Sequence, residues 1–108
     1  MSKVNVAAVM RALADPTRRV IFERIVKAQE ITVVELTHGS GVSQSAVSQH
    51  LRSLKEAGLV LERKSGRNAH YQVQPEGLAP LIDWLGISGV FWRDRFVRLR
   101  ELLMEIDS

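Results

Sequence analysis

Apolar residues recur at helical spacing in four stretches of the chain, each longer than two turns. The four predicted helices span residues 3–14, 16–28, 44–57 and about 75–106. Capping residues mark several of their boundaries. Asp15, followed by proline, and Ser43 are N-caps, and Gly58 follows a C-cap. A brief fifth helix over about 33–38 ends at a glycine-containing turn. The pattern therefore predicts a mainly helical chain.

Two stretches alternate with a period of two residues instead. LVLERK and AHYQVQ are joined by the turn SGRN, and this arrangement predicts a two-stranded hairpin over about 59–74. In the first strand Leu59 and Leu61 alternate with Val60 and Glu62. The β-branched residues at 31–33 add a short strand. The predicted fold class is mainly α with a small β-hairpin, in the order helix, helix, short strand, helix, helix, strand, strand, helix. A helix-turn-helix followed by a wing has this order.

The helix over 44–57 has an unusual polar face. Its buried stripe is Val47, Leu51 and Leu54, spaced at i, i+4 and i+7. The opposite face mostly carries serine, glutamine, Arg52 and Lys55, and its N-terminal part has serine and glutamine where a solvated helix usually carries Glu and Lys. The predicted DNA-binding residues are Ser43, Gln44, Ser45, Ser48, Gln49, His50, Arg52, Lys55, Lys64 and Arg67. Glutamine can pair with adenine through two hydrogen bonds, and cations bind phosphates. We interpret this helix as a recognition helix; the other interpretation is a merely polar surface.

Composition and charge narrow the class of protein. The 108 residues are 45% hydrophobic and 25% charged, with a net charge of +3, so we expect one domain over residues 1–108. The absence of cysteine excludes disulfides and thiolate chemistry, and suits a reducing compartment. No apolar run is long enough for a signal peptide or a membrane span, which favours a soluble, cytoplasmic protein. No Ser/His/Asp arrangement, phosphate loop or paired-acid motif indicates an enzyme.

Three blocks of sequence carry a family resemblance: ALADPTRRVIFERI, ITVVELTHGSGVSQSAVSQHLRSLKEAGLV and ERKSGRNAHYQVQPEGL. Over about residues 10–82 the chain resembles the ArsR-type winged-helix bacterial repressors. The resemblance implies a homodimer on a palindromic operator, with the first and last helices packed together at the dimer interface. The residues expected at that interface are Val6, Met10, Trp92, Phe96, Leu99 and Leu103.

The chain departs from the metal-sensing members of that family. Thr32-Val33-Val34 stands where those members have a Cys-Val-Cys-type site, and the last helix contains no histidine. Thr and Val do not hold a transition metal, so the chain resembles the subgroup without metal-sensing cysteines. We expect no metal and no cofactor. His38 and His70 are expected to be surface or wing residues.

The predicted function is a sequence-specific DNA-binding repressor, with recognition helix 44–57 and wing 59–74. Its expected partners are double-stranded DNA and a second copy of itself, and no membrane. The alternative is a winged-helix module that binds a protein through the same face. His50 is either a partly buried histidine bonded to backbone groups or a DNA contact, and Arg67 is either solvated or bound to a phosphate or the minor groove. The aromatic residues at 84–96 form core or dimer interface, or line the pocket of an organic effector.

Overall fold

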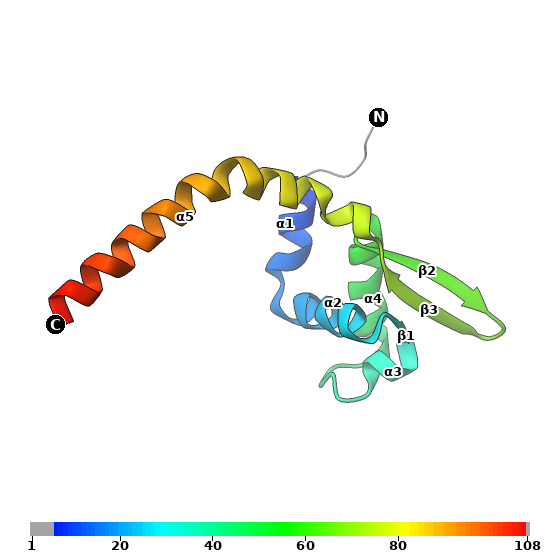
Figure 1. The fold of residues 1–108 in the computed structure, drawn as a ribbon. Coiled ribbons are helices and arrows are strands. Elements are labelled where there is room, and N and C mark those ends of the chain that lie inside the picture. Colours follow the sequence, from blue (N-terminus) through cyan, green and yellow to red (C-terminus); the bar gives the residue numbers. More distant parts are fainter. Residues whose placement is uncertain (1–5, 108) are drawn as a thin grey trace.

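The computed structural model describes the backbone of residues 6–107 and the side chains of all of these except 87–92 and 107. Figure 1 shows a small body of helices and a hairpin, from which one long helix projects. Along the chain the elements are α1 (Val6–Ala14), α2 (Pro16–Ala28), β1 (Glu30–Thr32), α3 (Val33–Thr37), α4 (Gln44–Glu56), β2 (Val60–Ser65), β3 (Asn68–Val73), the 3₁₀ turn η1 (Pro75–Leu78) and α5 (Ala79–Asp107). This order confirms the predicted winged helix-turn-helix.

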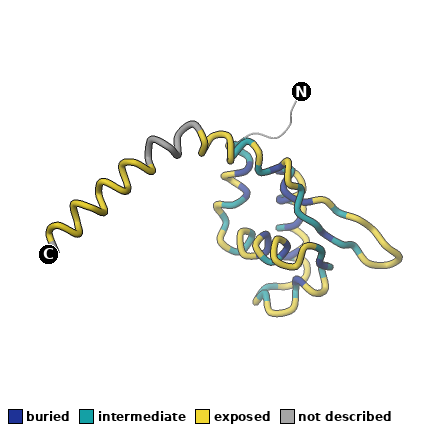
Figure 2. The backbone as a smooth tube through the Cα atoms, in the orientation of Figure 1, coloured by how far each residue is buried: buried dark blue, intermediate teal, exposed yellow. Residues whose placement is uncertain are grey.

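The hydrophobic core lies where α1, α2 and α4 meet the base of the hairpin, as the dark positions in Figure 2 show. α2 packs against both α1 and α4, and α3 packs against α4. The predicted stripe of α4 is confirmed, because Val47, Leu51 and Leu54 are all fully buried. Burying each such side chain contributes roughly 1.5–3 kcal/mol, so this stripe orients α4 firmly on the body.

The sheet confirms the predicted hairpin and shows which of its faces is buried. Its strand order is β1-β3-β2, and both pairings are antiparallel. Val60 is opposite Val73 and Glu62 is opposite Tyr71, so these four side chains share the face that covers the core. Leu61 therefore belongs to the outer face and is exposed, while Val60 is buried. The alternation of Leu59 and Leu61 did not identify the inner face, because Leu59 precedes the strand and is buried against the end of α4.

The end of α4 is closed by a glycine. The N–H of Gly58 donates to the Lys55 carbonyl at 3.0 Å, and the N–H of Leu59 donates to the Leu54 carbonyl at 2.9 Å. This pair of bonds is the Schellman motif, which needs a residue with positive φ between helix and strand. Gly58 has φ of 79° and supplies it. The cap directs the chain from the recognition helix straight into the wing.

A second glycine, Gly77 in η1, is required by close packing. A Cβ added there would lie 1.9 Å from the carbonyl oxygen of Gly58, so any side chain must displace backbone. We predict that Gly77→Ala lowers the free energy of unfolding by about 1–3 kcal/mol. Gly86→Ala is the matched control, because a Cβ there meets open space inside α5, and it should raise stability by up to about 1 kcal/mol. Urea unfolding followed by circular dichroism measures both. Equal midpoints for the two variants would contradict this packing argument.

α5 differs from the predicted last helix at its start and in its packing. Pro75 opens a 3₁₀ turn rather than the α-helix, and α5 then continues as one curved helix past Gly86 and Gly89 (Figure 1). Leu78 and Leu81 pack against the core. All described side chains of residues 82–106 are exposed, including the leucines. The radius of gyration is 17.7 Å, well above the roughly 13 Å of a compact domain of this length.

Candidate nucleic-acid interface

The polar side chains of α4 lie together on its exposed face. Ser43 is the N-cap, and its Oγ accepts a hydrogen bond from the N–H of Ala46 at 3.1 Å. The exposed side chains that follow are Gln44, Ser45, Ser48, Gln49 and Arg52. None of these five makes a hydrogen bond with a described residue of the chain. The first turn of α4 contains no acidic residue, so this end of the helix offers donors and acceptors without repelling phosphates.

The helix before the turn, α3, is held at both ends. Thr32 and Glu35 form a capping box, in which the N–H of Glu35 donates to Thr32 Oγ1 at 3.1 Å and the N–H of Thr32 donates to Glu35 Oε1 at 3.0 Å. Arg24 of α2 donates to the carbonyls of Leu36 and Glu35, at 2.5 and 3.0 Å. These contacts give the five-residue α3 a fixed position against α4, since a helix this short is not stable alone.

The wing ends in a two-residue loop, Gly66 and Arg67, between the paired residues Ser65 and Asn68. Gly66 has φ of 61°, as the first position of a type II′ hairpin turn requires. Lys64 and Arg67 are exposed, and the hairpin tip points away from the body in Figure 1. Neither cation has an ion-pair partner among the described residues. Both remain available for an external anion.

Lys55 differs from the other predicted cations because it is already paired. Its Nζ donates to Glu62 Oε1 at 3.0 Å, and the Tyr71 hydroxyl donates to Glu62 Oε2 at 3.2 Å. The hydrogen bond from Lys55 holds the pKa of Glu62 below its usual value, and burial followed by the Glu62 charge raises the pKa of Tyr71. Lys55 therefore ties α4 to β2, and it would reach a phosphate only by leaving Glu62.

His50 is partly buried, as one of its two interpretations expected. Its imidazole on α4 forms no hydrogen bond with a described residue, so the side chain does not satisfy backbone groups there. Its neighbour is Asp15, the N-cap of α2. The pKa of Asp15 is lowered mainly by the hydrogen bond from the Arg18 N–H, with smaller contributions from the charges of His50 and Arg18. A DNA contact by His50 stays a prediction.

Comparison with known proteins reveals the family. A helix-turn-helix domain model matches residues 13–63. A helix-turn-helix transcriptional regulator of Mycobacterium tuberculosis is 49% identical over 71 residues, covering 66% of this chain and 65% of that protein. A crystal structure of a possible transcriptional regulator for arsenical resistance superimposes with a TM-score of 0.68 and 42% identity, over 83% of this chain and 90% of that one. This chain belongs to the ArsR family of winged helix-turn-helix transcriptional regulators.

A second curated relative is an arsenic resistance transcriptional regulator of Pseudomonas putida, 40% identical over 68 residues, which cover 63% of this chain and 53% of that protein. The chain thus spans between half and two thirds of the length of these two relatives. A crystal structure of another ArsR family regulator has a TM-score of 0.71 with 26% identity, over 82% of this chain and 90% of that one. The family resemblance predicted from the sequence is confirmed.

In this ArsR protein, no group of three His, Asp or Glu side chains among the described residues is arranged to hold a metal ion. His38 is exposed at the end of α3. His70 is half-buried on β3, where its Nδ1 lies 3.4 Å from Glu30 Oε2.

No described helix is long and apolar enough to cross a membrane.

Sequence reasoning about this ArsR chain missed one cluster. Glu30 of β1 accepts hydrogen bonds from Arg63 of β2 and Gln72 of β3, at 2.7 and 2.6 Å. Arg63 is thereby drawn onto the sheet, which distinguishes it from Lys64 next to it. The residues are 33 and 42 positions apart, and only the strand order brings them together. No local pattern in the sequence could have revealed them.

Proposed function

We propose that this protein is a transcriptional repressor that binds a specific DNA sequence as a homodimer. The observation that carries the proposal is the exposed, acid-free row of serines and glutamines on α4, together with two wing-tip cations that have no ion-pair partner among the described residues. In this arrangement the N-terminal half of α4 enters the major groove, where Gln44, Ser48 and Gln49 meet base edges. Arg67 and Lys64 bind the backbone or minor groove beside it.

The proposed dimer rests on α5. Phe96, Leu99, Leu103 and Ile106 follow one another at intervals of three, four and three residues, which aligns them in a single stripe. Each is at least half exposed. An open groove lined by Leu85, Phe96, Val97, Leu99 and Leu103, with Arg93 and Arg100 beside them, follows this face. An exposed apolar stripe of this kind favours packing against a second copy of the chain, which removes it from water.

The accessible surface agrees with a subunit lacking its partner. It is 7971 Å², about 2,000 Å² more than the roughly 6,000 Å² typical of a folded monomer of this mass. α1 packs against α5, Met10 is 39% exposed and Val6 is half-buried. In the proposed dimer these two residues extend the interface. The side chain of Trp92, also predicted there, lies outside the described residues. Two-fold pairing would present two α4 helices to the two half-sites of a palindrome.

A selection with a pool of random duplexes tests the proposed function. DNA retained by the purified protein is sequenced, and the enriched duplex is titrated between about 50 and about 200 mM salt. We expect an inverted repeat, and an affinity that falls steeply with salt, with a slope of about −0.9 per phosphate contacted. Retention without any enriched sequence, or an affinity that does not respond to salt, would instead favour a winged-helix module that binds a protein.

A further inference from the structure

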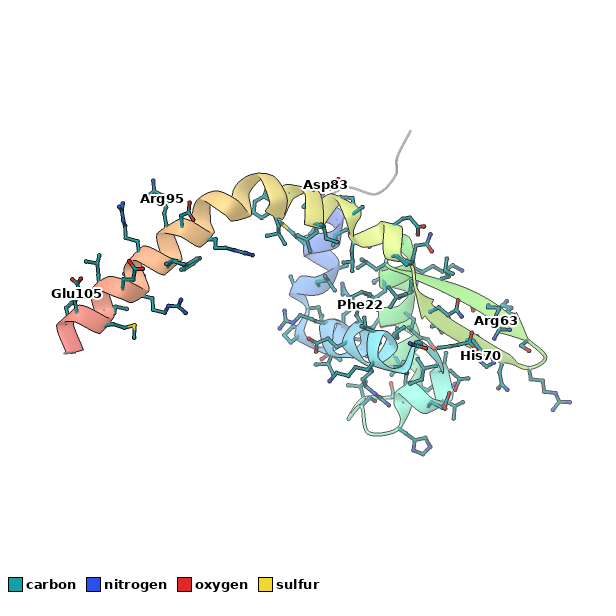
Figure 3. All side chains as sticks on the ribbon, in the orientation of Figure 1. Phe22, Arg63, His70, Asp83, Arg95 and Glu105 are labelled. Atoms are coloured by element: carbon teal, nitrogen blue, oxygen red, sulfur yellow. The ribbon has the colours of Figure 1, made fainter. Side chains whose placement is uncertain are left out.

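One carboxylate, Glu30, connects all three strands of the sheet. Its Oε2 accepts from Arg63 Nη2 at 2.7 Å, and its Oε1 accepts from Gln72 Nε2 at 2.6 Å. His70 Nδ1 lies 3.4 Å from the same Oε2. Figure 3 shows Arg63 and His70 beside each other on the hairpin. Because β3 lies between β1 and β2, the bond from Arg63 to Glu30 reaches across the central strand.

Glu30 lies at the start of the segment that leads into α3. Glu30 begins β1, and Thr32, the last residue of β1, is also the N-cap of α3. α3 in turn packs on α4. The carboxylate therefore joins the two strands of the wing to the segment that leads directly into the helix-turn-helix. On the opposite face of the sheet, Glu62, the residue before Arg63 in β2, fixes the wing to α4 through the bond from Lys55.

The ion pair between Glu30 and Arg63 contributes little to the stability of the fold. The side chain of Glu30 is 32% exposed and that of Arg63 is 53% exposed, and ion pairs of this kind contribute between nothing and about 1 kcal/mol. Two short charge-assisted hydrogen bonds instead define how β2 and β3 are oriented relative to β1. The hairpin pairs with β1 at three positions, and its base packs on α2, α3 and α4, while its tip at Arg67 lies beyond the β1 pairs. A small change of angle at Glu30 becomes a larger displacement at the tip.

We propose that Glu30 is a positioning residue for DNA binding, which holds the wing at the angle where Arg67 reaches the DNA while α4 occupies the major groove. This inference rests on the proposed function. Glu30 is acidic, and an acidic residue near DNA would otherwise be expected only to repel it. Removing a negative charge from a DNA-binding protein should tighten binding through the general electrostatic attraction. Removing Glu30 should weaken it.

A double-mutant cycle between Glu30 and Arg67 tests the proposal, using the duplex enriched in the selection. The proteins are the wild type, Glu30→Ala, Arg67→Ala and the double variant. Glu23→Ala is the matched control, because it removes the same charge from α2, where Glu23 is exposed and makes no ion pair among the described residues. We expect Arg67→Ala to weaken wild-type binding about fivefold or more and to lower the salt slope by about one unit. In the Glu30→Ala background the same change should alter affinity by less than about twofold.

The remaining outcomes separate this inference from the proposed function. If Arg67→Ala weakens binding equally in both backgrounds, Glu30 does not position the wing and the inference is overturned, while the wing contact stands. If Arg67→Ala has no effect in the wild type, the wing contact itself is wrong, and the inference is overturned with it. Thermal unfolding checks that Glu30→Ala is folded. Should it be unstable, Glu30→Gln keeps one acceptor oxygen, and the Arg67 effect is then expected to be intermediate.

Discussion

Replacing Gln49 with alanine is expected to lower affinity for the operator by about ten- to a hundredfold and to leave affinity for random DNA nearly unchanged. A good bidentate contact to a base is worth roughly 1–3 kcal/mol of discrimination, whereas non-specific binding depends on phosphates. Gln49 is exposed on α4 and makes no hydrogen bond with described residues, so the folded protein loses no internal contact. Ser48→Ala should act in the same direction. Fluorescence anisotropy with operator and random duplexes, at matched salt, measures the ratio.

The matched control for this substitution is Gln74→Ala. Gln74 precedes η1 at the end of the hairpin opposite its tip, and its side chain makes no capping hydrogen bond. Gln74→Ala should leave the affinities for operator and for random DNA unchanged. An equal loss of operator and random-DNA affinity in the Gln49 variant would show that Gln49 contacts the backbone, or that α4 is not the recognition helix. Loss of operator binding in the control would point to general instability instead.

Replacing Leu99 with aspartate is expected to convert the protein to a monomer at micromolar concentration and to abolish tight operator binding. Leu99 is 51% exposed in the middle of the α5 stripe, so an aspartate there costs the single chain little. In the proposed dimer the same carboxylate would be buried without a partner, which costs several kcal/mol per copy. Losing the dimer removes the simultaneous contact with two half-sites about 34 Å apart or a multiple of this. Leu103→Asp should behave in the same way.

Val26→Asp is the control for this prediction. Val26 is 48% exposed on α2, so the substitution introduces the same charge at a similarly exposed apolar position outside α5. Sedimentation velocity should show a dimer for the wild type and for Val26→Asp, and a monomer for Leu99→Asp. A monomeric Leu99→Asp protein that still binds the inverted repeat as tightly as the wild type would disprove the role of the α5 stripe. Retained dimerisation would place the interface elsewhere.

Local signals explain why most elements could be predicted from the sequence. Asp15 and Ser43 accept hydrogen bonds from backbone N–H groups in the first turn of α2 and α4, as their sequence positions indicated. Gly58 closes α4 with a positive φ. Such caps act over three or four residues, so they depend on neighbours along the chain rather than on the fold. The same holds for the exposed residues of α4, whose common face follows from helical periodicity alone.

Long-range features required the tertiary structure. Which face of β2 is buried depends on its register with β3. This pairing buries Val60 and exposes Leu61, which the alternation of residues alone did not indicate. Lys55 could not be distinguished from the other cations of the predicted interface, because its partner Glu62 is seven residues away on another element. The requirement for glycine at position 77 also appears only when η1 is placed against the end of α4.

The sequence by itself determined the helices, their caps, the polar face of α4 and membership of the winged-helix class, because each of these is encoded in spacing over one or two turns. The tertiary structure decided which charged groups are free. Within the described part of the chain it left Arg67 and Lys64 at the wing tip without an ion-pair partner, and it drew Arg63 and Lys55 into ion pairs with Glu30 and Glu62. The reason is that pairing between charges depends on distances across strands and helices, and the order of residues along a chain does not contain those distances.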